Sequence, residues 1–269
     1  MTGRENPWPL RGVIGHARSM TRSFDELISE AATADVTGWG FAWLTGRATE
    51  QRAPWGYTRL VAERAVGATA LLDVETGGGE VLAGIPGLPA RTVATEYWPP
   101  NLAVARRTLH PLGVEVVDGD PQQLPFEDET FDLVISRHPV ALPWGEAARV
   151  LRPGGTLLSQ GIGSDSMLEL AEAVAGPRPP STTSRAEGNA EAARAAGLTV
   201  TDLRTAALRA EFFDIGAVVY FLRKVVWTVP DFSIETHRAP LAELHQRIRT
   251  EGSFVAHAQR FLIEAHKPV

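Results

Sequence analysis

Between residues 68 and 160, short apolar runs alternate with segments whose apolar residues have helical spacing. The runs are continuous rather than alternating, which is typical of strands buried on both faces of a parallel sheet that helices cover. The clearest intervening helices are 99–113 and 143–154. The pattern predicts an α/β fold with a doubly wound sheet. The expected strands are 68–74, 91–97, 114–119, 131–137 and 155–161.

The last third of the chain changes character at residues 177–188, a proline- and serine-rich segment that predicts a loop. A short helix is expected over 189–197, followed by late strands over 198–213 and 254–267. The stretch between those two strands, 214–252, is too long for a hairpin turn and has helical spacing. We therefore expect it to be a helical insertion over the edge of the sheet.

The first 60 residues also have a helical pattern and are expected to form a second cover. The predicted organisation is an N-terminal helical cap over residues 1–60 and an α/β domain over 61–269, which includes the insertion. No internal repeat is detected. The tryptophans of the cap are Trp8, Trp39, Trp43 and Trp55.

Composition narrows the function. The chain has 269 residues, 44% of them hydrophobic, which is ample for a buried core. A net charge of −6 disfavours binding of duplex nucleic acid through phosphate contacts. The absence of cysteine removes disulfides and thiolate chemistry, and the seven histidines lack the spacing of metal ligands, so no metal is expected. No signal peptide or membrane span is evident, which predicts a cytoplasmic protein. A monomer or a homodimer is expected.

One short segment carries the strongest chemical pattern: residues 71–84 read LLDVETGGGEVLAG. Glycines between a strand and a helix let backbone amides approach a ligand closely. The dinucleotide fingerprint G-x-G-x-x-G, started at Gly77, fails at Leu82, where the third glycine belongs. Glu96 lies 19 residues after Gly77 at the end of the next strand, placed for a ribose hydroxyl of either a nicotinamide or another adenosine-containing ligand.

Four stretches in order extend this pattern: LLDVETGGGE, VATEYWPPNLAVAR, VDGDPQQLPFEDETFDLVISRHP and EAARVLRPGGTLLSQ. Through them the sequence resembles the class I S-adenosylmethionine-dependent methyltransferases, particularly the ubiquinone-biosynthesis type, or methyltransferase type 11 group. The resemblance covers roughly residues 68–160. It implies a Rossmann-like, mainly parallel seven-stranded sheet with an antiparallel C-terminal strand, S-adenosyl-L-methionine as the cofactor, and a small-molecule methyl acceptor.

The resemblance also implies a cofactor site at the carboxyl ends of the strands. The turn from Asp73 to Gly79 would surround the methionine part, and Glu96 would accept from both ribose hydroxyls. Tyr97 would flank the adenine, although it could be a buried strand end, and Asp120 would accept from the exocyclic amine. The expected cofactor-binding residues are Asp73, Glu75, Thr76, Gly77, Gly79, Glu96, Tyr97, Asp120, Pro121 and Arg137.

Pro121 departs from the family pattern. The backbone amide at this position often bonds the adenine ring in the family, and proline has no amide proton. Either one adenine contact is missing, or the loop is shifted and another amide supplies it.

Glu75 is the second departure, because it stands where such a turn usually has its first glycine. A carboxylate could attract the cofactor's ammonium, since opposite charges ~4 Å apart are worth about 4 kcal/mol at an effective dielectric near 20, before desolvation. It could also point to solvent, cap the next helix, or mark a disabled site. We favour a residue that is accommodated or faces the cofactor, since Gly77 to Gly79 remain for close approach.

The loop after residues 131–137 would face the transferred methyl group, and it reads RHPVALPWG. His138 is the candidate general base, because its ordinary pKa of ~6.5 suits proton removal near neutral pH, although a histidine before a proline can also be a turn residue. Tyr57 is the second candidate for a catalytic contact. RHPV is not the Asn/Asp-Pro-Pro-aromatic loop of many amine methyltransferases, which favours an oxygen, carbon or aliphatic nitrogen acceptor. Aromatic residues would enclose it: Trp39, Trp43, Trp55, Tyr57, Phe212, Phe213, Tyr220 and Trp227.

The sequence is compatible with three alternative functions. The leading one is an S-adenosylmethionine-dependent methyltransferase that transfers a methyl group to a small molecule by in-line displacement. The second is a protein that binds S-adenosylmethionine or S-adenosylhomocysteine without transferase activity, as a sensor or partner subunit. The third, a nicotinamide-dependent oxidoreductase, is disfavoured by Leu82 and by the LPF and LRPGG stretches.

Overall fold

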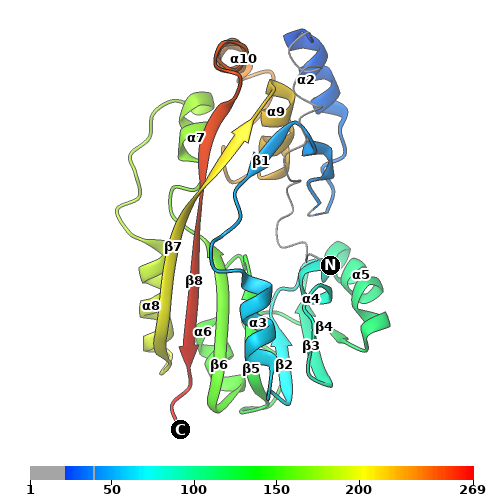
Figure 1. The fold of residues 1–269 in the computed structure, drawn as a ribbon, viewed down its shortest axis with the longest axis vertical. Helices are drawn as coiled ribbons and strands as arrows, with labels where there is room; N and C mark the ends of the chain where they lie inside the picture. The colour runs from blue at the N-terminus through cyan, green and yellow to red at the C-terminus, as the bar shows by residue number, and fades with distance from the viewer. Residues whose placement is uncertain (1–21, 39) are drawn as a thin grey trace.

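A computed structural model describes residues 22–38 and 40–269 of the chain (Figure 1). Its centre is an eight-stranded sheet with the order β1-β7-β8-β6-β5-β2-β3-β4. Trp8 and Trp39, which we placed in the N-terminal cover, lie outside the described residues.

Five neighbouring strands, β2 to β6, run parallel to one another. The side chains of β2, β3, β5 and β6 are mostly buried, as the continuous apolar runs predicted, whereas the edge strand β4 has no buried residue. Strand β6 begins at Leu151, inside the segment 143–154 that we expected to be helical throughout. The bounds are β2 Ala70–Asp73, β3 Arg91–Glu96, β4 Glu115–Asp118, β5 Phe131–Arg137 and β6 Leu151–Ile162.

The two late strands complete the predicted sheet of seven. Strand β8 (Phe254–His266) lies between β6 and β7 (Thr199–Phe212) and is antiparallel to both. The Rossmann-like fold with a reversed C-terminal strand is therefore confirmed. An eighth strand, β1 (Ala48–Glu50), pairs with the end of β7 and was not predicted, because three residues are too few to show an apolar pattern.

Helices cover both faces of the sheet (Figure 1). One face packs against α3 (Tyr57–Ala65), α4 (Glu80–Ala83) and α5 (Pro99–Leu109), which is followed by the 3₁₀ turn η2 (His110–Leu112). The other face packs against α6 (Trp144–Val150) and α8 (Arg185–Ala195). Helix α8 begins inside the segment 177–188 predicted as a loop, because the Ser184 hydroxyl accepts from the Glu187 amide and caps it.

A third apolar cluster lies where β7 and β8 extend beyond the parallel strands, at the upper end of Figure 1. The predicted insertion is helical there and contributes α9 (Ile215–Lys224) and α10 (Arg238–Glu251). The other elements of this cluster are α2 (Phe24–Thr33), the 3₁₀ turn η1 (Ala42–Leu44) and α7 (Leu168–Ala175). The N-terminal segment and the insertion thus share one core, and the division at residue 60 stays a prediction.

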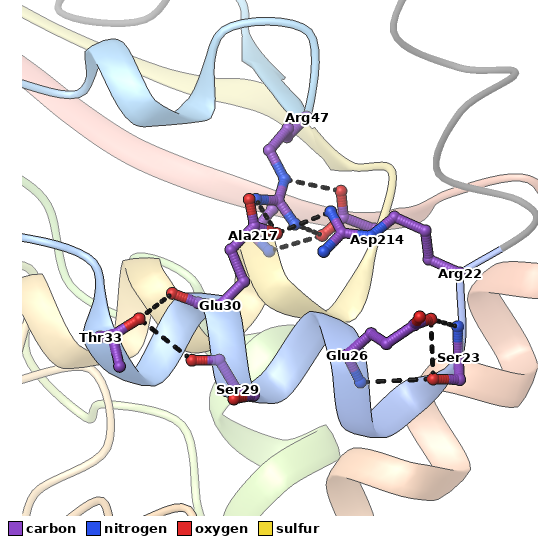
Figure 2. A network of polar contacts seen from close by, with 9 residues as sticks. All are labelled: Arg22, Ser23, Glu26, Ser29, Glu30, Thr33, Arg47, Asp214 and Ala217. Carbon is purple, nitrogen blue, oxygen red and sulfur yellow. Dashed lines mark hydrogen bonds and ion pairs between the residues drawn. The ribbon is translucent and has the colours of Figure 1, made fainter.

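Polar contacts also join the N-terminal segment to the insertion (Figure 2). The Arg47 guanidinium donates to both oxygens of Asp214, with Nε–Oδ2 and Nη2–Oδ1 distances of 2.8 Å. Asp214 also accepts from the Ala217 amide and caps α9. Arg47 lies over the Trp43 ring, which stacks on Tyr220 with ring centroids 4.7 Å apart. Several aromatics expected around the acceptor therefore pack on one another.

None of the helices in the described part of the chain has the length and apolarity that a membrane span requires.

Candidate functional site

Three carboxylates gather at the carboxyl ends of β2 and β3. Asp73 is the last residue of β2, Glu75 is in the turn that follows, and Glu96 is the last residue of β3. The two strands are parallel neighbours in which Asp73 pairs with Ala94, so their ends meet at one edge of the sheet. Burial raises the pKa of both other carboxyls, and the charge of Glu96 adds to each rise. The sequence predicted that these residues share one edge of the sheet, and their strand ends meet there, while their role in binding the cofactor stays a prediction.

Asp73 is the most perturbed of the three. Burial raises the pKa of its carboxyl to about 7, and the charge of Glu96 adds to the rise, while Thr76 and Arg137 oppose it. The Thr76 hydroxyl lies near enough to lower this pKa but forms no hydrogen bond of normal geometry within the described residues. A buried carboxyl of this kind becomes more acidic when a cation binds beside it.

Glu96 is held by backbone amides. Its Oε1 accepts from the amides of Tyr97 and Trp98 at 3.0 and 2.9 Å, and its Oε2 accepts from the Gly77 amide at 2.9 Å. The Asn101 side chain adds a longer contact to Oε2 at 3.4 Å. A carboxylate has about four acceptor positions, so a ribose would have to share or replace these donors.

Glu75 bridges the glycine turn to the loop after β5. Its Oε2 accepts from the Val140 amide at 2.9 Å. Its backbone has a φ of 57°, a strained value for a residue that is not glycine. Burial raises the pKa of the Glu75 carboxyl, and the Val140 hydrogen bond opposes the rise. The side chain therefore does not cap α4, whose N-cap is Gly79.

The turn itself is built by glycines and leaves two hydroxyls without partners. Gly77 and Gly79 have φ values of 64° and 79°, which glycine adopts without strain. Among the buried side-chain atoms of residues 22–38 and 40–269, the hydroxyls of Thr76 and Tyr57 lack a hydrogen-bond partner. The Ser136 backbone lies close to Tyr57 without reaching that geometry.

Tyr57 comes from α3 and joins the site next to Asp73. Burial raises the pKa of the Tyr57 hydroxyl well above its usual range, the negative charge of Asp73 raises it further, and the charge of Arg137 opposes both. The ring is only 3% exposed. Tyr57 therefore stays protonated and can donate a hydrogen bond to a bound ligand.

The predicted adenine side of the site is open. Tyr97 is 47% exposed, so it is not a buried strand end. Asp120 forms a local turn in which its Oδ1 accepts from the Gln122 amide at 2.8 Å and its carbonyl accepts from the Gln123 amide at 3.0 Å. The two amides that follow Pro121 are thus already used within this turn.

A positive charge lies near Asp73. Burial raises the pKa of Asp73, Tyr57 and Glu50, and the charge of Arg137 opposes each rise, so Arg137 lies near all three groups. Glu50 of β1 pairs with Arg260 of β8 at 3.0 Å, and both side chains are buried. The unpredicted strand β1 therefore brings a carboxylate to the site.

His138 follows β5 and contacts a buried polar chain. Its amide donates to the Gln160 carbonyl at 2.7 Å, and its Nε2 lies 3.0 Å from the Gln160 Nε2. The Gln160 Oε1 in turn accepts from the Trp55 indole at 2.6 Å. Burial, with the charges of Arg137 and Arg260, holds the pKa of the half-buried His138 ring well below its usual value.

Sequence analysis missed Gln160, Arg260 and Glu50 as site residues. Gln160 could have been found, because it has a long polar side chain in a strand segment, GTLLSQG, that the sequence predicts to be buried. Arg260 and Glu50 gave no such signal, because each lies in a strand that contains other polar residues.

A cavity of about 260 Å³ lies on the opposite face of the sheet, beneath the same loop after β5. It is lined by both apolar and polar groups of that loop, α6, α8, β6 and β8. They include Val140, Leu142, Trp144, Asn189 and Phe261.

The sheet order, the glycine turn after β2 and the acidic end of β3 define a Rossmann-like nucleotide-binding class of protein. Comparison with known families narrows this class, because residues 72–159 match a family model described as a methyltransferase domain. The chain contains a class I S-adenosylmethionine-dependent methyltransferase domain of the type 11 group.

Similar proteins agree with this assignment. A probable phthiotriol/phenolphthiotriol dimycocerosates methyltransferase of Mycobacterium ulcerans is 34% identical over 110 residues, which cover 37% of this chain and 42% of that protein. A demethylmenaquinone methyltransferase of Thermus thermophilus is 37% identical over 102 residues, 33% of this chain and 44% of the relative. The matched stretch thus spans less than half the length of these relatives. The structure of a putative methyltransferase from Bacillus halodurans shares the fold, with a TM-score of 0.56, 21% identity, and coverage of 79% of this chain and 99% of that one.

Proposed function

We propose that this protein transfers a methyl group from S-adenosylmethionine to a small-molecule acceptor. The observation that carries the proposal is the carboxylate cluster of Asp73, Glu75 and Glu96, in which burial raises the pKa of the first two. Such a cluster favours a cationic ligand, and S-adenosylmethionine carries a sulfonium and an ammonium. A nicotinamide dinucleotide, with its two phosphates, would be repelled.

The residues present fit this cofactor. The unpartnered hydroxyls of Thr76 and Tyr57 lie at the turn that would surround its methionine part, and Asp73 would face its ammonium. Arg137 stands beside Asp73 and suits the cofactor's carboxylate. Glu96 would hold the ribose by sharing the amide bonds that it now accepts. Tyr97 is exposed enough to stack on the adenine.

When bound, the cofactor supplies an electrophilic methyl group. The contribution of the chain is to align the acceptor in line with that group and to exclude water. The loop after β5 is placed for this, because Glu75 ties its Val140 amide to the cofactor turn. His138 would then stand on the acceptor side.

The acceptor is proposed to be a small molecule methylated on oxygen, carbon or an aliphatic nitrogen. The two relatives above are named for phthiotriol dimycocerosates and for demethylmenaquinone, and neither name is that of a protein or nucleic acid. The net charge of −6 agrees with an acceptor that is not a nucleic acid.

Binding is tested by thermal shift and calorimetry with S-adenosylmethionine, S-adenosylhomocysteine and NAD. We expect the two methionine-derived nucleosides to stabilise the fold by mass action and NAD to have no effect. No shift with either nucleoside would contradict the proposal. Transfer is then tested with methyl-labelled cofactor and a metabolite extract, in which a labelled product is expected.

One observation favours the second candidate, a cofactor-binding protein without transferase activity. The acceptor positions of Glu96 are filled by four donors, which is more typical of a structural carboxylate than of a ribose site. Tight binding of S-adenosylhomocysteine with no labelled product from any extract would support this candidate.

A further inference from the structure

In the hydrogen-bonded chain Trp55–Gln160–His138, the chemistry of the groups fixes which atom donates and which accepts in each bond. An indole N–H is a donor only, so the Gln160 atom 2.6 Å from the Trp55 Nε1 must be the amide oxygen. The amide nitrogen of Gln160 then points to His138, where it lies 3.0 Å from Nε2. An amide nitrogen only donates, so the His138 Nε2 must be the acceptor.

This direction sets the protonation of the ring. A neutral imidazole has one protonated nitrogen, and since Nε2 accepts, the proton must be on Nδ1. The backbone supports the arrangement, because the His138 amide also donates to the Gln160 carbonyl at 2.7 Å. Both Trp55 and Gln160 are buried, at 3% and 4% exposure, so water does not compete for these bonds.

The Nδ1 atom of His138 is available to bind a ligand. Within the described residues His138 has no hydrogen-bond partner at Nδ1. It is also not one of the enclosed side-chain atoms that lack a partner in the described part of the chain, which are the hydroxyls of Tyr57 and Thr76 and the Nδ1 of His245. An N–H that is neither bonded nor enclosed can meet a ligand.

We propose that His138 is a neutral hydrogen-bond donor, fixed by Trp55 through Gln160, and not a general base. Resting on the proposed function, this role implies an acceptor that offers an oxygen lone pair to the Nδ1 proton, as a carbonyl or carboxylate does. The nucleophile then needs no proton removed by this histidine. Trp55 and Gln160 are positioning residues, which act through His138.

The surrounding charges agree with a neutral ring and an electron-rich oxygen. The positive charges of Arg137 and Arg260 both oppose a charge on His138, and burial has the larger effect in lowering its pKa. Glu50 faces the same two arginines and is paired with Arg260.

The test is the tautomer itself, measured by long-range ¹H–¹⁵N NMR on ¹⁵N-histidine-labelled full-length protein between pH 6 and 8. We expect the His138 signals of a neutral ring protonated on Nδ1 across the whole range. A ring protonated on Nε2, or an imidazolium at pH 7, would overturn the proposal. This measurement needs no turnover, whereas calorimetry with S-adenosylmethionine tests the proposed function separately.

Gln160→Glu provides an isosteric switch. A carboxylate can accept from Trp55 with one oxygen and from the His138 Nε2 with the other, so we expect the proton to move to Nε2 and the His138 titration to shift to higher pH. Gln246→Glu makes the same charge change on the exposed side of α10 and should leave the His138 signals unchanged. If Gln160→Glu also left them unchanged, Gln160 would not control the ring and the proposal would fail.

Discussion

The Glu75 carboxylate accepts a hydrogen bond from the Val140 amide at 2.9 Å, across 65 residues of sequence. The bond joins the turn after β2 to the loop after β5, the two segments expected on either side of the transferred methyl group. Glu75 therefore occupies the usual place of a glycine for a structural purpose. Its φ of 57° is the cost of that contact.

Replacement of Glu75 separates the structural role from an ionic one. Glutamine keeps an oxygen that accepts from Val140, so Glu75→Gln should change the Kd for S-adenosylmethionine by less than about threefold, or ~0.6 kcal/mol. Glu75→Ala loses the tie and should weaken binding more. Calorimetry at pH 7.5 checks both variants. A loss of tenfold or more with Glu75→Gln would show instead that the carboxylate pairs with the cofactor.

Asp73 should make the free protein less stable as the pH rises. Its folded-state pKa of about 7 exceeds the ordinary value of 3.8, so the folded state holds the proton more tightly. Stability is therefore fully present below pH ~4 and is lost progressively up to pH ~7. At ~1.4 kcal/mol per pKa unit, the full loss is about 4 kcal/mol.

Asp73→Asn removes this effect, and urea unfolding at pH 5, 7 and 8 measures it. The variant should be more stable than the wild type at pH 8 by up to about 4 kcal/mol, with a smaller gain at pH 5. It should also bind S-adenosylmethionine much more weakly. Glu191→Gln, an exposed change on α8, should show no pH-dependent difference. Equal stability of Asp73→Asn and the wild type at pH 8 would contradict the argument.

Cofactor binding should release a proton near neutral pH. The bound ammonium favours the ionised form of Asp73, so the affinity for S-adenosylmethionine should rise as the pH passes through about 7. Calorimetry in buffers of different ionisation enthalpy measures the proton released. An affinity that stays constant from pH 6 to 8 would mean that Asp73 does not face the cation.

The sheet could be predicted from the sequence because buried parallel strands form continuous apolar runs, and the acidic ends of β2 and β3 could be placed with it. The hydrogen-bond partners of these acidic residues could not be predicted. Glu96 is bound by backbone amides, and the tie between Glu75 and Val140 depends on how two distant turns approach. Strand β1 was not predicted for a related reason: its three residues form a strand because they pair with β7, and not because of their own sequence pattern.

The buried pair of Arg47 and Asp214 should contribute strongly to stability. Asp214 is 3% exposed, receives two bonds from Arg47 and caps α9. Asp214→Ala removes both of its bonds to Arg47, which keeps the Glu30 contact at 3.1 Å, and it removes the cap of α9, so we expect a loss of about 3–5 kcal/mol in urea unfolding. Glu63→Ala breaks the exposed pair with Arg59 and should cost less than about 0.5 kcal/mol. A loss below about 1 kcal/mol for Asp214→Ala would show that solvent replaces the pair.

His245 should make the protein less stable in acid. The ring lies in the core 5.6 Å from the Phe24 ring, is 3% exposed, and has a buried Nδ1 without a partner. Burial, followed by the charge of Arg249, lowers the pKa of His245, and Asp214 opposes the shift. Because the folded pKa is below the ordinary ~6.5, the unfolded state binds more protons, and stability is lost as the pH falls below ~6.5.

His245→Phe removes the titrating group and keeps an aromatic ring. The stability of the wild type minus that of this variant, from urea unfolding at pH 7, 6 and 5, should therefore decrease by at most ~1.4 kcal/mol per pH unit. The exposed change His110→Gln should leave the pH dependence of the wild type unaltered. Parallel curves for the wild type and His245→Phe would show that the buried ring accepts a proton without cost.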